Sequence, residues 1–222
     1  MIVLLSGWAG FRASLIPMQL ALRERSGREV TRADVGLGLG CIHESAERLA
    51  IELELVTRGA DGPLDLVGYS MGGLIATQLL KVVDRGARVR TVVTLDTPHR
   101  GSPALRTRGA LFARWSASLR QIVPGCEFLE SLAAAAVPPG SRVVSISSYG
   151  DTLVPPPFAE LPPLEGHSNR VLSGIGHFGL LVSPAALGAI EPLVTPPVTR
   201  RARKSPRAPR SPSARARAAG AL

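Results

Sequence analysis

The amino-acid sequence predicts an α/β fold with a mostly parallel sheet and helices on both faces. Two observations support this prediction: short runs rich in β-branched residues alternate with longer segments of helical periodicity, and a serine between glycines stands at a strand-to-helix junction. Such alternation is typical of parallel sheets, because parallel strands need long crossover connections. The chain of 222 residues can bury one core of this kind without disulfides or metals. We expect a single α/β domain over residues 1–199.

The expected strands and helices follow one another along the chain. Apolar, β-branched runs predict strands at residues 2–5, 29–33, 64–67, 89–95, 142–147 and 169–172. Apolar residues at helical spacing predict helices at residues 13–26, 44–57, 71–85 and 184–194. The sheet should therefore have about six strands.

The segment Gly68–Gly72 joins the third expected strand to the third expected helix. A serine in so sharp a turn has strained backbone dihedral angles, and glycines two residues away on either side avoid collisions with the strand and the helix. The turn would lift the Ser70 hydroxyl clear of the sheet. It would also direct the Met71 backbone N–H, at the helix N-terminus, toward a developing oxyanion. This pattern predicts Ser70 as a nucleophile.

A serine nucleophile needs a base, and the chain has four histidines. His177 lies in a glycine-rich loop after the last expected strand, which belongs at the same sheet edge as Ser70, so we expect His177 to be the base. His43, at a helix start, and His167, in a polar loop, are expected at the surface. His99 follows a strand end, where it is either a structural loop residue or part of the pocket lining.

The base in turn needs an acid to orient it. Asp151 follows the fifth expected strand and precedes the histidine loop by one strand, so its carboxylate can reach the Nδ1 atom of His177. The chain order Ser70, Asp151, His177 is the one that this architecture imposes. Asp96 also ends a strand and is the competing candidate, but we expect the Thr-Pro-His turn after it to direct its side chain elsewhere.

A second oxyanion donor should come from residues 6–10, directly after the first strand. The glycines of this loop allow its backbone to approach a substrate carbonyl group, and the backbone N–H of Trp8 is the expected donor beside that of Met71.

Three stretches together resemble the α/β-hydrolase superfamily, and more narrowly its bacterial triacylglycerol-lipase and GPI-inositol-deacylase-like branch. They are Asp65–Leu74, Thr97–Ser102, and Asp151–Pro155 with Gly176–His177. The similarity extends from about Ile2 to Val194. It implies that Ser70, Asp151 and His177 are nucleophile, acid and base, with Trp8 and Met71 supplying oxyanion amides.

The chain departs from the pattern of that family in two residues. Ser6 stands where such lipases usually have a histidine before the glycine of the oxyanion loop, and Tyr69 replaces the common histidine before the serine. The strands that often precede the oxyanion strand are absent. The resemblance therefore implies a reduced α/β-hydrolase fold.

The segment Ser102–Gly140 is too long for a simple crossover and carries apolar residues at helical spacing. We expect one or two helices that form a cap over the carboxyl-terminal edge of the sheet. The apolar stripe either packs on the core or acts as a lid that borders a substrate acyl chain. The candidates for the substrate pocket are Tyr69, His99, Phe112, Trp115 and Phe178.

The residues together predict a lipase or esterase, a serine hydrolase that cleaves a small acyl ester or a lipid through an acyl-enzyme intermediate. Thioester hydrolysis and acyl transfer by the same fold remain open, because they depend on pocket shape and water access. A non-catalytic binding protein that acts through a basic tail is the alternative from another class. The sequence indicates no cofactor, no metal site and no obligate protein partner.

The net charge of +9 is concentrated at the end of the chain. Arg200–Leu222 holds eight of the 26 basic residues and no acidic one, which leaves 18 basic against 17 acidic residues in the body. The Arg/Ala/Pro/Ser composition of this tail offers few apolar residues to bury, so we expect disorder, with weak attraction to anionic lipid or nucleic acid as an alternative to no specific role. Cys41 and Cys126 fit two free thiols. With no signal peptide or membrane span in the sequence, the expected location is cytoplasmic.

Overall fold

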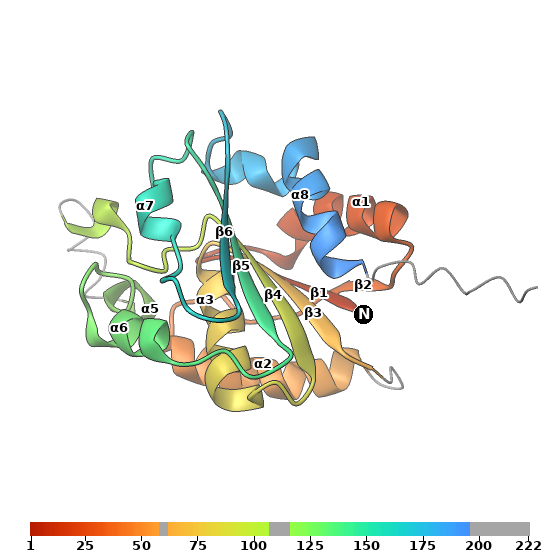
Figure 1. Ribbon diagram of the computed structural model, residues 1–222, viewed down its shortest axis with the longest axis horizontal. Helices are drawn as coiled ribbons and strands as arrows, with labels where there is room; N and C mark the ends of the chain where they lie inside the picture. The colour runs from red at the N-terminus through yellow and green to blue at the C-terminus, as the bar shows by residue number, and fades with distance from the viewer. Residues whose placement is uncertain (58–61, 107–115, 196–222) are drawn as a thin grey trace, which may run out of the picture.

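The computed structural model describes residues 1–57, 62–106 and 116–195. Its centre is a sheet of six parallel strands in the spatial order β2-β1-β3-β4-β5-β6 (Figure 1). The strands are β1 (Ile2–Leu5), β2 (Val30–Arg32), β3 (Leu64–Tyr69), β4 (Val89–Leu95), β5 (Arg142–Ser148) and β6 (His167–Leu172). The predicted parallel sheet of about six strands is confirmed, with β2 shorter than expected and β6 beginning two residues earlier.

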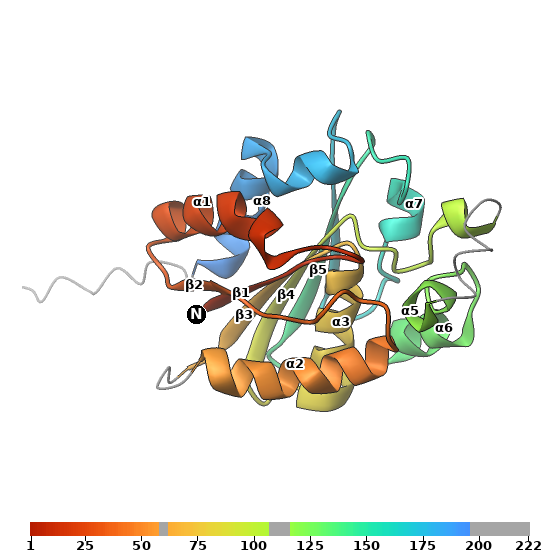
Figure 2. The same cartoon turned by 180° about the vertical axis from the view of Figure 1, so that it is seen from behind.

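Helices cover both faces of the sheet (Figures 1 and 2). One face carries α1 (Ile16–Ser26), preceded by the 3-10 turn η1 (Arg12–Leu15), together with α8 (Pro184–Val194). The other face carries α2 (Ile42–Val56) and α3 (Met71–Gln78). The helix expected at residues 71–85 is present, but its second half is a π-helical stretch, η2 (Leu79–Asp84).

The pattern of β1 explains why both faces need helices. Side chains of successive strand residues point to opposite faces of a sheet. Val3 and Leu5 join the apolar cluster under α2 and α3, whereas Ile2 and Leu4 join the cluster under α1 and α8. All four residues are buried, so a strand in this position must be apolar throughout rather than alternating.

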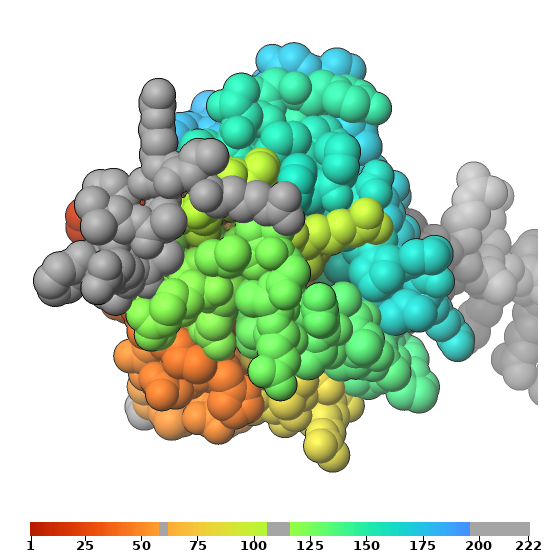
Figure 3. All heavy atoms as spheres, turned by 90° about the vertical axis from the view of Figure 1, so that its left-hand side faces the viewer, coloured from red at the N-terminus to blue at the C-terminus, as the bar shows by residue number. Residues whose placement is uncertain are grey.

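The described part of the segment from Ser102 to Gly140 forms three short helices beside the carboxyl-terminal edge of the sheet. They are η3 (Pro103–Arg106), α5 (Ala117–Arg120) and α6 (Glu127–Ala134). Figure 3 shows them as the green surface between α2 and the turquoise region around α7 (Pro156–Ala159). The described part is helical as expected, although its helices are shorter than one or two continuous ones would be.

The opposite, amino-terminal edge of the sheet is tied together by charges. Asp65, near the start of β3, is fully buried, and Arg90 of β4 approaches its Oδ2 atom at 2.9 Å. Arg28 binds the same carboxylate and also donates to the carbonyl groups of Met1 and Val194. One carboxylate therefore links β1, β3, β4 and the end of α8.

Two further expectations concern regions beyond this core. Within the described residues, no helix has the length and apolar character needed to cross a lipid bilayer. The basic tail expected at residues 200–222 lies outside the described residues.

Candidate active site

The turn between β3 and α3 holds Ser70 in a strained conformation. Ser70 has φ 52° and ψ −124°, a region that side-chain-bearing residues rarely occupy. A Cβ atom on Gly68 would lie 2.5 Å from the Cα atom of Gly73, and one on Gly72 would collide with the carbonyl oxygen of Ser6. The glycines on either side of Ser70 are therefore required by close backbone approach, as the sequence predicted.

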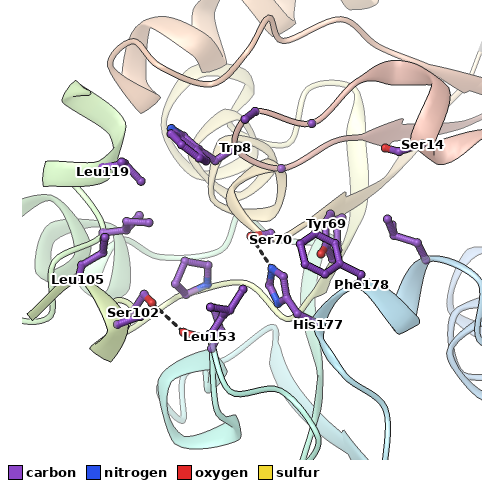
Figure 4. A pocket seen from close by; sticks show the side chains of 18 of the residues that line it. Trp8, Ser14, Tyr69, Ser70, Ser102, Leu105, Leu119, Leu153, His177 and Phe178 are labelled. Atoms are coloured by element: carbon purple, nitrogen blue, oxygen red, sulfur yellow. Dashed lines mark hydrogen bonds between the residues drawn. The ribbon is translucent and has the colours of Figure 1, made fainter. Parts of the chain in front are cut away.

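Three side chains from three different loops form a chain of hydrogen bonds at the carboxyl edge of the sheet. The Nε2 atom of His177 lies 3.2 Å from Ser70 Oγ, as the dashed line in Figure 4 marks. The Nδ1 atom of the same ring lies 2.5 Å from Asp151 Oδ2. With hydrogen on Nδ1, the imidazole donates to Asp151 and accepts from Ser70. The side chain of His177 is only 9% exposed.

Asp151 is held as an anion by several donors. Its Oδ1 atom accepts from the backbone N–H groups of Leu153 at 2.7 Å and Val154 at 2.9 Å. Burial by itself would raise the pKa of Asp151, but the hydrogen bonds from His177 and Val154 outweigh it and hold the pKa below its ordinary value. Asp151 is therefore a carboxylate at neutral pH.

Gly150 brings the Asp151 loop and the His177 loop together. A Cβ atom on Gly150 would lie 2.6 Å from the carbonyl oxygen of Ile175, and the backbone N–H of Ile175 donates to Ser148 Oγ at 3.0 Å. These contacts fix the distance between the two loops. The structure thus brings the side chains of Ser70, Asp151 and His177 together.

Contrary to the expectation from the sequence, the side chain of Asp96 does not turn away from this site. Its Oδ2 atom lies 4.0 Å from His177 Nδ1, against 2.5 Å for Asp151 Oδ2. The backbone of Asp96 has φ 41°, and its Oδ1 atom accepts a hydrogen bond from the backbone N–H of Ser148 at 3.0 Å, which holds the carboxyl group beside the end of β5. The Thr-Pro-His turn after it instead supports Ser70, since Thr97 Oγ1 donates to the carbonyl oxygen of Ser70 at 2.8 Å.

The loop after β1 lies directly over Ser70. A Cβ atom on Gly7 would be 2.9 Å from Ser70 Cβ, so only glycine allows this approach. Ser6 Oγ donates to the carbonyl oxygen of Gly10 at 3.2 Å and closes the loop. Trp8 lines the same pocket as Ser70, and Met71 is the first residue of α3.

A second loop, residues 36–40, supports the first and was not singled out as functional from the sequence. The backbone N–H of Ala9 donates to the carbonyl oxygen of Leu37 at 2.9 Å. A Cβ atom on Gly38 would lie 3.4 Å from both the Sδ atom of Met71 and the Cα atom of Trp8. The alternating glycines at 36, 38 and 40 were the available signal, because they permit such close backbone contact.

Ser70 and His177 line a pocket of about 670 Å³. Figure 4 shows Leu105 and Leu119 on one side of Ser70, and Tyr69 and Phe178 on the other. Ser102 Oγ donates to the carbonyl oxygen of Leu153 at 2.7 Å, which ties the pocket wall to the Asp151 loop. The lining is mostly apolar, as expected of a site for an apolar ligand.

The predicted pocket candidates have different outcomes. Tyr69 and Phe178 line the pocket, and their rings lie 5.0 Å and 5.6 Å from the imidazole of His177. Phe112 and Trp115 lie outside the described residues. Burial raises the pKa of Tyr69, which keeps its phenol neutral beside the site.

His99 is not among the described residues that line this pocket, so its candidacy is corrected. It lines a separate cavity of about 80 Å³, and its Nε2 atom lies 2.9 Å from Thr94 Oγ1. Burial lowers the pKa of His99 to about 3, so the ring is neutral. Its role in the described structure is that of a buried loop histidine.

Of the other two histidines, His43 is exposed as expected, and His167 is half-buried at the start of β6.

The cluster of Asp96, Asp151 and His177 also contains atom types that bind metal ions, within 4.8 Å of one another. The Nδ1 and Oδ2 atoms of His177 and Asp151 are already in direct hydrogen-bonding contact at 2.5 Å. These two atoms are therefore partners of each other in the hydrogen-bonded chain to Ser70.

Comparisons with known proteins identify relatives of this fold. The sequence model of the family described as PGAP1-like alpha/beta domain matches residues 53–140. Comparison with curated protein sequences gives no match.

Similar solved structures include three lipases. The mature lipase BlEst2 of Bacillus licheniformis has a TM-score of 0.73 at 18% identity, covering 88% of this chain and 91% of that chain. Aspergillus fumigatus lipase B has a TM-score of 0.69 at 18% identity, covering 86% of this chain but only 51% of its own. The monoacylglycerol lipase of Paleococcus ferrophilus has a TM-score of 0.59 at 13% identity, covering 87% of this chain and 91% of that chain. The chain therefore has the α/β-hydrolase fold, as its resemblance to that superfamily predicted.

Proposed function

We propose that the protein is a serine hydrolase of the lipase or esterase kind, which cleaves carboxylic esters with apolar acyl groups. The observation that carries this proposal is the hydrogen-bonded chain from Ser70 through His177 to Asp151, at the floor of a mostly apolar pocket. The fold shared with lipases agrees with it. The fold alone would not be sufficient, because one fold supports many reactions.

In the proposed reaction, Ser70 Oγ attacks the ester carbonyl carbon while His177 Nε2 takes the hydroxyl proton. The backbone N–H groups of Trp8 and Met71 stabilise the oxyanion of the tetrahedral intermediate. His177 then gives the proton to the leaving alkoxide, and the acyl group remains on Ser70. Water, deprotonated by His177, attacks this acyl-enzyme and releases the carboxylic acid. Asp151 holds the ring and stabilises its positive charge throughout.

The residues around Ser70 support an apolar acyl group as the substrate class. Leu105, Leu119 and Ile122 come from the segment proposed as the cap and line the pocket. Leu119 and Ile122 are also part of the core cluster, so this side of the pocket is rigid. We propose that the segment 102–140 serves as this cap within one domain of residues 1–199.

The first test is the substitution Ser70→Ala. We expect hydrolysis of p-nitrophenyl esters to fall by at least about 10³-fold, because the nucleophile is lost and little packing changes. The matched control is Ser14→Ala, which removes an exposed hydroxyl group from the rim of the same pocket. Its turnover should stay close to wild type. Turnover that survives in Ser70→Ala would refute the assignment.

A covalent probe gives a second readout that does not depend on the choice of substrate. A fluorophosphonate should label the wild-type protein at one residue, and mass spectrometry should place the label on Ser70. Because labelling needs only an activated serine, it separates a wrong nucleophile from a poorly chosen ester.

A further inference from the structure

Asp96 is a buried carboxyl group that the proposed reaction does not use. It lies directly after β4, has no exposed surface, and its Oδ1 atom accepts from the backbone N–H of Ser148 at 3.0 Å. Its Oδ2 atom is buried and has no hydrogen-bond donor among the described residues. That atom faces the site, 4.0 Å from His177 Nδ1.

The backbone at Asp96 is strained in a way that places this side chain. Its φ of 41° is one of four positive values at non-glycine residues in the described chain, and another belongs to Ser70. Such a conformation is unfavourable for a residue with a Cβ atom and persists only where the surroundings enforce it. The strain therefore marks a position at which the direction of the carboxyl group matters.

Two adjacent buried carboxyl groups cannot both be ionised without strong repulsion. Asp151 accepts hydrogen bonds from His177 and from two backbone N–H groups, whereas Asp96 accepts from one. The negative charge therefore belongs on Asp151 and the proton on Asp96. Burial, with the nearby Asp151, raises the pKa of Asp96 to about 9, which agrees with this assignment.

None of the charged and titratable groups described around Asp96 is a fixed cation that would stabilise its ionised form. Asp151 comes from the loop after β5, His177 from the 3-10 turn η4 (His177–Leu181), and Tyr69 from the end of β3. Among the described residues, no Lys or Arg forms an ion pair with Asp96. Its negative charge would therefore lack a fixed cation.

We propose that Asp96 is a positioning residue, whose protonated carboxyl group donates a hydrogen bond from Oδ2 to Asp151 and holds that carboxylate toward His177. The unpartnered Oδ2 atom is then satisfied, and the Asp151 carboxylate receives a fourth donor. Asp96 itself gives up and receives no atom during ester hydrolysis. The catalytic consequence rests on the proposed hydrolase function, whereas the protonation state does not.

The first arm of the test compares two substitutions by their kinetics. Asp96→Asn keeps a neutral donor of the same shape, so we expect kcat/KM at neutral pH to stay within about threefold of wild type. Asp96→Ala removes the donor and should lower kcat by about tenfold or more, with KM nearly unchanged. Asp151→Asn should be far more damaging, by about 10⁴-fold. If Asp96→Asn were as inactive as Asp151→Asn, Asp96 would act as an anion and the proposal would be overturned.

The second arm measures stability and needs no activity. An Asp in the unfolded chain ionises near its ordinary pKa of about 4, whereas folded Asp96 keeps its proton up to about pH 9. Between these values the folded protein binds more protons, so this group makes the free energy of unfolding fall as pH rises. Asp96→Asn should remove that decline. Its stability relative to wild type should increase from about pH 5 to about pH 8 in denaturant titrations; an unchanged difference would contradict the proposal.

A third measurement uses the wild-type protein and stays informative if a variant fails to fold. Infrared spectroscopy should detect the band of a protonated carboxyl group at neutral pH, where ordinary Asp and Glu side chains are ionised. The absence of this band would overturn the proposal. If the band is present and no ester is hydrolysed, the proposed function fails while the protonation of Asp96 stands.

Discussion

At the scale of single residues, Gly7 shows how closely the site is built. A Cβ atom at position 7 would lie only 2.9 Å from Ser70 Cβ, so Ser70 occupies the space that a side chain would need. The proposed oxyanion donor Trp8 is the next residue. Any side chain at position 7 must therefore move either the nucleophile or the oxyanion loop.

Gly7→Ala should consequently lower kcat/KM by about 10²–10³-fold, the loss typical of a misplaced oxyanion donor. The protein should still fold, at a cost of about 1–3 kcal/mol for the overpacking. Gly188→Ala is the matched control, because Gly188 lies exposed in α8 and a Cβ atom there meets nothing within 4 Å. The control should keep full activity and gain about 0.5–1 kcal/mol of stability. Equal activity in both variants would show that the contact with Ser70 is unimportant.

The sequence was sufficient to predict which residues would meet, but not how each would point. Ser70, Asp151 and His177 follow parallel strands, and the carboxyl ends of parallel strands share one edge, so their proximity follows from chain order. The Asp96 side chain is held where the backbone has φ 41° and Ser148 N–H donates to Oδ1, and no residue pattern reveals either feature. His99 was one of the pocket candidates, but its hydrogen bond with Thr94 holds it in the core, which fits the alternative of a structural loop residue.

At the scale of elements, the sheet was predictable because its inner strands β1, β3, β4 and β5 are buried almost throughout and rich in apolar, β-branched residues. The helix after Ser70 was predicted as one unit, but its second half is π-helical. A π-helix differs from an α-helix by a hydrogen bond that spans one more residue, and amino-acid composition does not reveal this difference. The segment after β4 was the hardest to predict. Its apolar residues serve the core and the pocket together, so a pattern of buried positions could not separate the two roles.

The pocket wall from η3 allows a test of acyl-chain length. Leu105→Trp should fill part of the cavity, so kcat/KM for long-chain p-nitrophenyl esters should fall by about tenfold or more. Acetyl and butyryl esters, which need less space, should change by no more than about twofold. Leu20→Trp, on the exposed side of α1, controls for an added tryptophan. A uniform loss over all chain lengths would mean that the acyl group lies elsewhere.

At the scale of the whole molecule, the buried ion pairs of Asp65 lie at the edge of the sheet opposite the site. Asp65→Ala should lower the free energy of unfolding by about 3–5 kcal/mol, because it leaves Arg28 and Arg90 without their buried partner. Denaturant titration measures this loss. The folded fraction should keep its kcat, since Asp65 and Ser70 lie at opposite ends of β3. A large fall in kcat per folded molecule would show that the two edges are coupled.

The position of the Asp65 cluster has a consequence for how this protein could change over time. Residues that hold the sheet together occupy one edge, and the loops that would select a substrate occupy the other. Substitutions in the pocket wall formed by η3 and α5 therefore leave the ion pairs at the other end of the strands unchanged. Selection for a new substrate would therefore act on residues other than the Asp65 cluster, although changes at Leu119 of α5 would also reduce core packing.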